Sequence, residues 1–355
     1  MPSIPVTHAT GSYDVHVASG LIAEAAGRIA ASLPGRRLAL VTDPQIRAAL
    51  TSNGHWPAIE ATVIEVPPGE RAKTRDEWGR VTDQLLALGL GRDSALVALG
   101  GGSIGDLTGF VAATYLRGVP FVQIPTTLLA MVDASVGGKV AIDTAAGKNL
   151  VGAFHPPALV IADPGMLATL PDRVYREGLA EAVKHGVVAD REYFEWIAKN
   201  AAGLVRREPK LLTHLVQRSV EIKAGVVSRD EHETGERAIL NAGHTIGHAL
   251  ERLSSYTLPH GEGVAIGLVA ECRIAEGMKL AEPGLADRVA GLLVELGLPV
   301  AVEPRPATRD LLTAMSTDKK NRGGRIRMAL PAAIGRMTAT SGEWTVEVGE
   351  QELPG

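Results

Sequence analysis

The chain has 355 residues, with 36 Lys and Arg against 40 Asp and Glu, for a formal net charge of −4. Aromatic residues make up only 4%, so the chain lacks the basic surface and stacking side chains of a nucleic-acid-binding protein. The single cysteine excludes an internal disulfide framework. No Lys or Arg precedes Arg28, and the longest uncharged stretch, residues 118–132, is too short to span a bilayer. We expect a cytoplasmic globular protein.

Short apolar runs alternate with amphipathic segments in the first half of the chain. The pattern predicts strands at residues 37–42, 61–66, 94–99, 121–124 and 159–162, with helices at 75–88 and 107–116. Residues 94–99 are apolar almost without interruption, as in a strand that is buried on both faces. This alternation indicates an α/β fold with a mostly parallel, Rossmann-like sheet.

The pattern changes after a proline-containing segment at residues 163–171. Apolar spacing then predicts helices at 174–199, 211–227, 243–253, 263–279 and 285–296, followed by short strands near 325–330 and 344–348. We therefore predict two domains, an α/β nucleotide-binding domain at 1–170 and a mainly α-helical metal- and substrate-binding domain at 171–355.

Glycine accounts for 40 of the 355 residues, and four of them lie between Gly100 and Gly105. The sequence Gly100-Gly-Gly-Ser-Ile-Gly105 follows a predicted strand and precedes a helix, as in loops that bind a pyrophosphate through backbone N–H groups. A tight turn without a ligand is the alternative, and the strand–turn–helix context favours the nucleotide. No acidic residue lies between Asp106 and Asp133 to hold a ribose. Asp43 and Glu70, near the ends of other strands, are candidates for that role.

Three of the ten histidines lie within a short segment, at positions 244, 248 and 260. His244 and His248 share a helix face, and His260 precedes the next predicted helix. Two or three imidazoles with one carboxylate suit a catalytic zinc ion that keeps an open position. Glu181 is a candidate carboxylate. Ordinary structural histidines are the alternative, and the spacing leaves open whether His248 is a ligand.

Four lysines lie among glycines or small residues instead of in charged runs. Any one of them alone would be a solvated surface residue. Together with two arginines they suit a strongly anionic small substrate. The set is Lys139, Lys148, Lys184, Lys223, Arg117 and Arg237.

The order of these motifs resembles that of the 3-dehydroquinate synthases, a family of sugar-phosphate cyclases. The resemblance runs from about Asp43 to Lys320. It rests on the glycine loop with its continuation to Pro120 and on Ile124-Pro-Thr-Thr-Leu-Leu-Ala-Met-Val-Asp133. It also rests on Gly137-Gly-Lys139, Gly147-Lys-Asn149, Glu181-Ala-Val-Lys184, Asn241-Ala-Gly-His-Thr-Ile-Gly-His248, His260-Gly-Glu262 and Asp318-Lys-Lys320.

The resemblance implies a lyase of the shikimate pathway to chorismate and the aromatic amino acids. Its reaction converts 3-deoxy-D-arabino-heptulosonate 7-phosphate to 3-dehydroquinate and phosphate. NAD+ transiently oxidises a hydroxyl group, phosphate is eliminated, the ketone is reduced again, and an intramolecular aldol reaction closes the ring. The resemblance also implies an active site in the cleft between the two domains.

The resemblance assigns roles to individual residues. Zinc, or cobalt in its place, would be held by Glu181, His244 and His260, with His248 contacting substrate instead. NAD would contact Asp43, Glu70, Lys73, Gly101, Gly102, Ser103, Asp106, Thr126, Thr127, Lys139 and Lys148. Substrate would contact Asp133, Lys139, Lys148, Asn149, Lys184, Lys223, Arg237, Asn241, His248 and either Lys319 or Lys320, of which we favour Lys320. Arg117 would reach the active site of a neighbouring subunit, which implies a homodimer.

Two other enzyme classes remain as alternatives. One is another sugar-phosphate cyclase, of the valiolone or inosose type, and the other is a metal-dependent polyol or glycerol dehydrogenase. The heptulosonate phosphate carries a carboxylate, which the substrates of the rival cyclases lack. The dehydroquinate reaction is therefore favoured by the presence of Lys223, Arg237, Asn241 and His248 together. Four positions depart from the commonest family pattern, and we expect them to affect packing: Ala134, Val140, Ala141 and His185.

Overall fold

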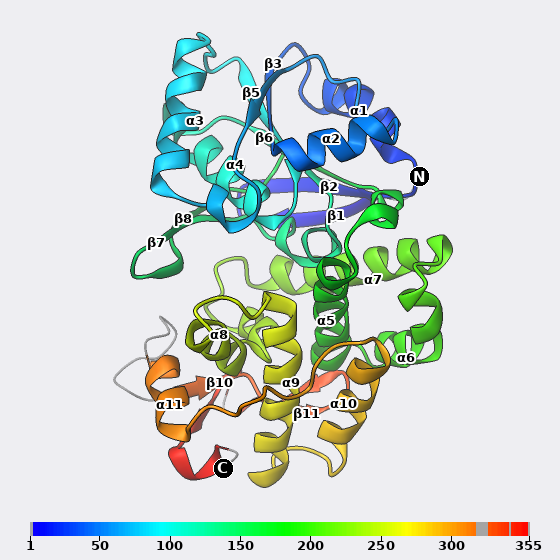
Figure 1. Cartoon of the computed structure of the whole chain (residues 1–355), viewed down its shortest axis with the longest axis vertical. Coiled ribbons are helices and arrows are strands. Elements are labelled where there is room, and N and C mark those ends of the chain that lie inside the picture. The colour runs from blue at the N-terminus through cyan, green and yellow to red at the C-terminus, as the bar shows by residue number, and fades with distance from the viewer. Residues whose placement is uncertain (1–2, 317–325, 341, 354–355) are drawn as a thin grey trace. The chain divides into compact units, whose positions relative to one another are not determined.

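The computed structural model describes residues 3–316, 326–340 and 342–353. Contacts divide the chain into two compact units, Met1–Leu170 and Pro171–Gly355 (Figure 1). Within the described ranges, no helix is both long and apolar enough to cross a membrane.

The first unit is built on a seven-stranded sheet in the order β1-β2-β9-β6-β5-β3-β4. Only β1 pairs antiparallel, with β2, and the other neighbours are parallel. The predicted strands at 37–42, 94–99 and 159–162 are present, and their bounds differ from the prediction by at most one residue. The first two strands of the sheet were not predicted. The strands are β1 (Ser3–His8), β2 (Gly11–Val17), β3 (Arg37–Thr42), β4 (Thr62–Glu65), β5 (Ser94–Gly100), β6 (Phe121–Pro125) and β9 (Leu159–Ala162).

The order of strands changes direction between β3 and β5. The chain runs outward from β3 to β4, then returns across β3 to β5 and continues to β6 and β9. In doubly wound sheets, ligands bind beyond the carboxyl ends of the strands at such a switch point. Asp43 follows β3 and the glycine loop follows β5, so this topology places both predicted nucleotide-binding segments at the same edge of the sheet.

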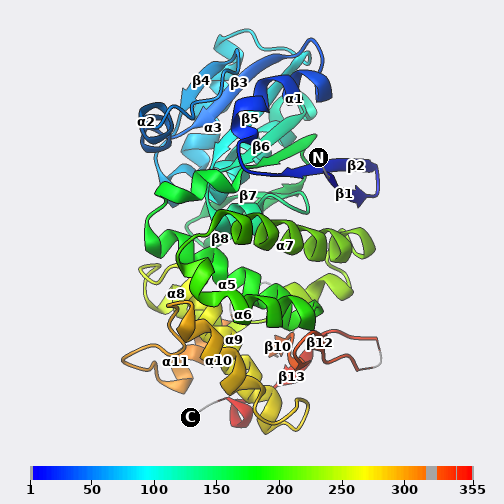
Figure 2. The same ribbon diagram turned by 90° about the vertical axis from the view of Figure 1, so that its right-hand side faces the viewer.

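Helices α3 (Arg75–Ala87) and α4 (Gly102–Thr114) pack on this sheet. Val81 of α3 and Leu107 and Val111 of α4 join Leu96 of β5 in one buried cluster. The unit also contains α1 (Ala25–Ser32), α2 (Pro44–Ser52) and a hairpin of β7 (Lys139–Thr144) and β8 (Gly147–Phe154), and Figure 2 shows it from a second side. Val140 of β7 lies in the same cluster, so the hairpin is anchored to α4.

The second unit is mainly helical, as predicted. Its helices are α5 (Asp172–Ala189), α6 (Arg191–Val205), α7 (Pro209–Arg229), α8 (His244–Leu253), α9 (His260–Gly277), α10 (Leu285–Glu295) and α11 (Thr308–Ser316). The single helix predicted at 174–199 is wrong, because the chain leaves helical geometry at Asp190. The Asp190 side chain accepts a hydrogen bond from the Tyr193 N–H and so begins α6.

Short strands complete this unit. They are β10 (Ile326–Met328), which pairs with β13 (Val346–Val348), and β11 (Pro331–Ala333), which pairs with β12 (Arg336–Met337). Their apolar residues, such as Met328 and Val348, share a core with Ile246 of α8 and Ile274 of α9. The helices that carry the three clustered histidines, α8 and α9, therefore pack against strands from the last thirty or so residues of the chain.

Candidate active site

The glycine loop joins β5 to α4 in the first unit. Gly101 is the N-cap of α4 and provides no side-chain hydrogen bond to the helix. A Cβ on Gly101 would lie 3.2 Å from Thr127 Cγ2, and one on Gly102 would lie 3.3 Å from Ala134 Cβ. The residues next to the start of α4 are therefore small. The N-cap residue, Gly101, has no side chain that could accept a hydrogen bond from the first N–H groups of the helix. Such a start can bind a pyrophosphate.

Two other glycines of the loop are required for packing. A Cβ on Gly100 would lie 2.5 Å from Ile104 Cδ1, and one on Gly105 would lie 2.7 Å from Gln123 Oε1. Both distances are far below van der Waals contact. The glycine excess therefore has two causes in this loop, a helix packed tightly on the sheet and a backbone left open to a ligand.

Lys73 is the centre of a polar network beside this loop. Its Nζ donates to Asp106 Oδ2 at 2.7 Å and to Asn149 Oδ1 at 2.5 Å, and the residue is 4% exposed. Burial lowers the pKa of Lys73, but the carboxylates of Asp106 and Glu70 outweigh this effect and raise its pKa. The buried Lys73 ammonium thus holds two predicted site residues, Asp106 and Asn149, together.

Glu70 extends the network on its other side. Its Oε1 accepts from Ser103 Oγ at 2.6 Å, and its Oε2 lies 3.6 Å from Lys148 Nζ. Burial raises the pKa of Glu70, but Lys73 and Lys148 lower it below the usual value. Asp143, which the sequence analysis missed, accepts from the Asn149 N–H at 2.8 Å. Its own pKa is raised, chiefly by burial.

The remaining predicted nucleotide residues have local structural partners. Asp43 Oδ1 accepts from the N–H groups of Gln45 and Ile46 at 2.8 and 2.9 Å and so caps α2. Thr126 donates its N–H to Gly100 O at 2.9 Å, and Thr127 Oγ1 accepts from the Ala130 N–H at 3.2 Å. A ribose contact at Asp43 therefore has to coexist with a helix cap.

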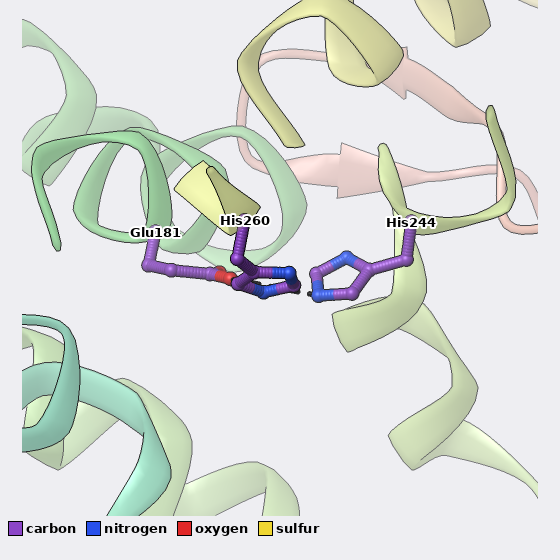
Figure 3. Close-up of side chains that lie close together, drawn as sticks. All are labelled: Glu181, His244 and His260. Carbon is purple, nitrogen blue, oxygen red and sulfur yellow. Dashed lines mark hydrogen bonds and ion pairs between the residues drawn. The ribbon is translucent and has the colours of Figure 1, made fainter. Parts of the chain in front are cut away.

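Figure 3 shows the three predicted metal ligands lying close together in the second unit. Glu181 comes from α5, while His244 and His260 are the first residues of α8 and α9. The Nε2 atoms of His244 and His260 lie 3.5 and 3.2 Å from the same atom, Glu181 Oε1. Ligand atoms of all three residues lie within 4.8 Å of one another. Two nitrogens and one oxygen therefore face a common point.

The outer nitrogens of the two rings show how well this set fits a metal ion. His244 Nδ1 lies 3.1 Å from Ala242 O, and His260 Nδ1 lies 2.8 Å from Glu251 Oε1. When Nδ1 donates to these acceptors, the lone pair of Nε2 is left pointing inward, as zinc requires. The donor set of two imidazoles and one carboxylate leaves a tetrahedral position open, so these residues fit a catalytic zinc ion.

A buried lysine neutralises the carboxylate of this group. Lys184 Nζ lies 2.6 Å from Glu181 Oε2, one turn along α5. Burial raises the pKa of Glu181, but Lys184 and His244 hold it well below its usual value. In the metal-free protein, burial and Lys184 lower the pKa of His244 to about 4. Burial also lowers the pKa of His260, but hydrogen bonds to Glu181 and Glu251 outweigh it and raise the pKa to about 10.

His248 belongs to a different grouping. Its ring centroid is 5.2 Å from that of His244 and 5.7 Å from that of His260. Its ligand atom lies within reach of Glu251 and His260, in a second set of three that excludes Glu181. His248 therefore lies beside the predicted metal ligands. This position is compatible with the substrate contact that the resemblance assigned to it.

Further predicted substrate residues are buried in the second unit. Lys223 of α7 is 7% exposed, and Arg237 is 2% exposed. Arg237 donates from its side chain to Glu231 O, and its backbone N–H donates to Asp230 Oδ2 at 2.9 Å. Asn241 Nδ2 donates to Glu233, which the sequence analysis missed. Asp230, Glu231 and Glu233 thus accept the hydrogen bonds that hold Arg237 and Asn241 in place.

Other predicted site residues lie elsewhere in the first unit. Asp133 is half-buried in the turn of π-helix at Ala130–Ala134, and Lys139 is exposed at the first residue of β7. Arg117 is exposed, with a positive φ of 69° next to Leu116 at 51°. The predicted phosphate contact at Lys319 or Lys320 lies outside the described residues.

The four departures from the family pattern are placed as follows. Val140 is 2% exposed and lies in the core of the first unit, while Ala141 is its neighbour on β7. Ala134 is half-buried beside the start of α4. His185 is fully buried within α5.

Comparison with known proteins shows the family of the chain. The family model described as 3-dehydroquinate synthase N-terminal matches residues 63–177, and the one described as 3-dehydroquinate synthase C-terminal matches residues 178–321. A 3-dehydroquinate synthase of Paracoccus denitrificans is 46% identical over 343 residues, which cover 93% of this chain and 92% of that protein.

Two solved structures have a similar fold over nearly the whole chain. A 2-deoxy-scyllo-inosose synthase complexed with carbaglucose-6-phosphate, NAD+ and Co2+ is 25% identical with a TM-score of 0.88, and the match covers 99% of this chain and 98% of that one. The 2-epi-5-epi-valiolone synthase from Streptomyces hygroscopicus, with NAD+ and Zn2+ bound, is 30% identical with a TM-score of 0.84, covering 96% and 94%. By the family models and the curated relative, the chain belongs to the 3-dehydroquinate synthase family.

Proposed function

We propose that this chain is a lyase that converts 3-deoxy-D-arabino-heptulosonate 7-phosphate to 3-dehydroquinate and phosphate and that depends on NAD+ and a divalent metal ion. The observation that carries the proposal is the convergence of two imidazole Nε2 atoms on Glu181 Oε1, with Lys184 buried beside them. This group combines a metal-ligand set with a cation, which suits a substrate that has both hydroxyl groups to polarise and anionic groups to hold.

Glu181, His244 and His260 would hold the metal ion, and the first turn of α4 with Glu70, Lys73 and Asp106 would hold NAD+. When bound, the metal would act as a Lewis acid on the substrate hydroxyl groups, and NAD+ would accept and return a hydride. NAD+ together with Co2+ or Zn2+ in the two similar cyclases supports both assignments.

The chain's own residues would then orient a doubly anionic substrate. Lys184, Lys223 and Arg237 are buried cations of the second unit, and we assign them to the carboxylate and phosphate groups, with Asn241 and His248 as further polar contacts. Asp133, Lys139, Lys148 and Asn149 of the first unit are assigned to the same substrate. Fixing a flexible sugar acid in one geometry lowers the entropic part of the barrier.

We assign the protein to the cytoplasm and to a homodimer. The only cysteine, Cys272, is buried, which suits a reducing compartment. Arg117 is exposed on a turn with positive φ, where it could reach a second copy of the chain. Size-exclusion chromatography with light scattering tests the dimer, and a monomeric mass at working concentration would contradict it.

A comparison of two substrates tests the proposed reaction. Purified protein with Zn2+ and NAD+ should release phosphate from the heptulosonate phosphate and form 3-dehydroquinate. It should act far more slowly on a heptulose phosphate that lacks the carboxylate. A preference for the substrate without the carboxylate would instead identify a cyclase of the valiolone or inosose type, the class to which the two similar solved structures belong.

A further inference from the structure

We propose that Glu251 and Glu271 are positioning residues that fix the two histidine ligands of the metal site in a reciprocal manner. Glu251 lies on α8 and holds the ring of His260 at the start of α9. Glu271 lies on α9 and holds the start of α8, where His244 lies. The proposal rests on the metal site of the proposed function and adds the two side chains that orient it.

Both histidine ligands occupy the first residue of a helix. The first turn of a helix has N–H groups without partners inside the helix, and a side chain at the N-cap usually satisfies one of them. The N-cap of α8 is Gly243, which has no side chain and adopts a positive φ of 81°. The start of α8 therefore depends on an acceptor from elsewhere in the chain.

Glu271 provides that acceptor. Its Oε2 accepts from the Gly243 N–H at 2.6 Å, and its Oε1 accepts from the N–H groups of Thr245 and Ile246 at 3.2 and 3.3 Å. The side chain is fully buried. A carboxylate at this end of a helix also interacts favourably with the helix dipole. Glu271 therefore fixes the backbone on both sides of His244.

Glu251 makes the matching contact in the opposite direction. It is 2% exposed, and its Oε1 lies 2.8 Å from His260 Nδ1. A carboxylate behind a histidine ligand fixes the ring orientation and keeps the proton on Nδ1, so that Nε2 can bind the metal. The Nε2 of His260 faces Glu181 Oε1 at 3.2 Å, which is the direction this role requires.

The close approach of α8 and α9 explains how both carboxylates reach across. A Cβ on Gly267 would lie 2.0 Å from Gly243 O, and one on Gly247 would lie 2.8 Å from Gly263 O. The two backbones are thus in direct contact through glycines. Each helix begins with a metal ligand and, further along, carries the carboxylate that supports the other helix's ligand.

The test measures Zn2+ affinity of the metal-stripped, full-length chain by competition with a chelator. Removing a carboxylate that hydrogen-bonds the ring of a histidine ligand typically weakens metal binding 10- to 100-fold, so E251Q should weaken it by about 10-fold or more, and E251A by more than E251Q. E271Q should also weaken Zn2+ binding, because it releases the backbone that places His244. The visible absorption spectrum of the Co2+ form should also change in both glutamine variants. This spectrum reports ligand geometry, which a loss of stability alone would not alter.

Glu276 provides a matched control on the same helix. Its Oε1 accepts from the Ala286 N–H of α10 at 3.0 Å, so it supports a helix that carries no proposed metal ligand. E276Q should lower the thermal midpoint of the apoprotein while Zn2+ affinity and the Co2+ spectrum stay as in the wild type. An equal loss of affinity in E276Q would mean that general destabilisation explains the other variants, and would overturn the proposal.

Two further outcomes separate this proposal from the proposed function. If E181Q abolishes Zn2+ binding while E251Q and E271Q bind as tightly as the wild type with unchanged Co2+ spectra, the positioning roles are wrong and the metal site stands. If E181Q binds Zn2+ like the wild type and E251Q does not bind, the ion lies instead at His248, Glu251 and His260, and both proposals are wrong. An effect of only one glutamate would overturn the reciprocal arrangement. Should E271Q fail to fold, wild-type binding by E251Q would still refute it.

Discussion

Lys184 Nζ lies 2.6 Å from Glu181 Oε2, and neither side chain is more than 1% exposed to solvent. The two residues lie three positions apart on α5, so the helix itself sets their geometry. The other carboxylate oxygen of Glu181 faces the two histidine rings. One carboxylate thus connects the Lys184 ammonium with the proposed metal position, and the loss of either partner should be partly offset by the other.

Replacement of Lys184 by methionine should therefore destabilise the metal-free protein more than the zinc-bound protein. Without Lys184 and without a metal ion, the buried Glu181 carboxylate keeps only its contacts with His244 and His260, and removing one partner of a buried ion pair typically costs about 3–5 kcal/mol of unfolding free energy. Bound zinc would neutralise that carboxylate and reduce the difference from the wild type. Urea unfolding with EDTA or with excess Zn2+ measures both values. Lys199→Ala, at an exposed position of α6, should change stability by less than about 0.5 kcal/mol. Equal losses for Lys184→Met in both conditions would refute the compensation.

Asp43 combines a structural role with a predicted cofactor role, and two substitutions separate them. Asp43→Ser keeps a side-chain oxygen for the Gln45 and Ile46 N–H groups, so stability should stay close to the wild type. Asp43→Ala removes the cap and should cost about 1 kcal/mol. NAD+ affinity, measured by calorimetry, should fall in both variants because both lack the carboxylate. Unchanged NAD+ affinity in Asp43→Ser would leave Asp43 as a helix cap alone.

Gly267 should be intolerant of even a methyl group. An alanine Cβ there would lie 2.0 Å from Gly243 O and push α8 and α9 apart. We expect Gly267→Ala to cost about 3 kcal/mol or more in urea unfolding and to weaken Zn2+ binding. Gly291→Ala in α10, where nothing lies within 4 Å of the new Cβ, should stabilise the protein by about 0.5–1 kcal/mol. Similar effects at both positions would show that helix packing at Gly267 is not tight.

The loop that carries Arg237 should lose stability in acid. Burial raises the pKa of Asp230, but N–H donors from Thr234, Arg237 and Gly235 outweigh this effect and hold the pKa below its usual value. The folded-state pKa of Asp230 is lower than its pKa in the unfolded chain. The stability that the ionised Asp230 contributes is therefore fully present when the pH is above the unfolded-state pKa, and it is lost as the pH falls through the folded-state pKa. Asp230→Asn should therefore be less stable than the wild type at pH 7, on the order of 1 kcal/mol, with the difference shrinking at pH 3. A difference that persists unchanged at pH 3 would contradict this account.

The sequence predicted those features that depend on local pattern. Strand β9 was predicted with its bounds because Leu159–Ala162 is a short, continuous apolar run. The break at Asp190 was missed because apolar spacing continues on both sides of it, and the start of the second helix is marked by a single hydrogen bond, from the Tyr193 N–H to the Asp190 side chain.

The supporting residues of the site could not be predicted in this way. Glu251 and Glu271 look like ordinary helical glutamates, and their partners lie 9 and 28 residues away in the chain. Asp143 similarly joins the Lys73 network only through the fold of the β7–β8 hairpin. Motif residues that match a family could be named from the sequence, whereas the groups that orient them required tertiary structure.

In the proposed reaction the chain uses NAD+ as a catalyst in eliminating phosphate. The most direct test follows phosphate release and absorbance of NADH together, with heptulosonate phosphate in large excess over NAD+ and with Zn2+ present. We predict many equivalents of phosphate and 3-dehydroquinate per NAD+, with no net accumulation of NADH. No phosphate release, or NADH formed in proportion to substrate consumed, would contradict it.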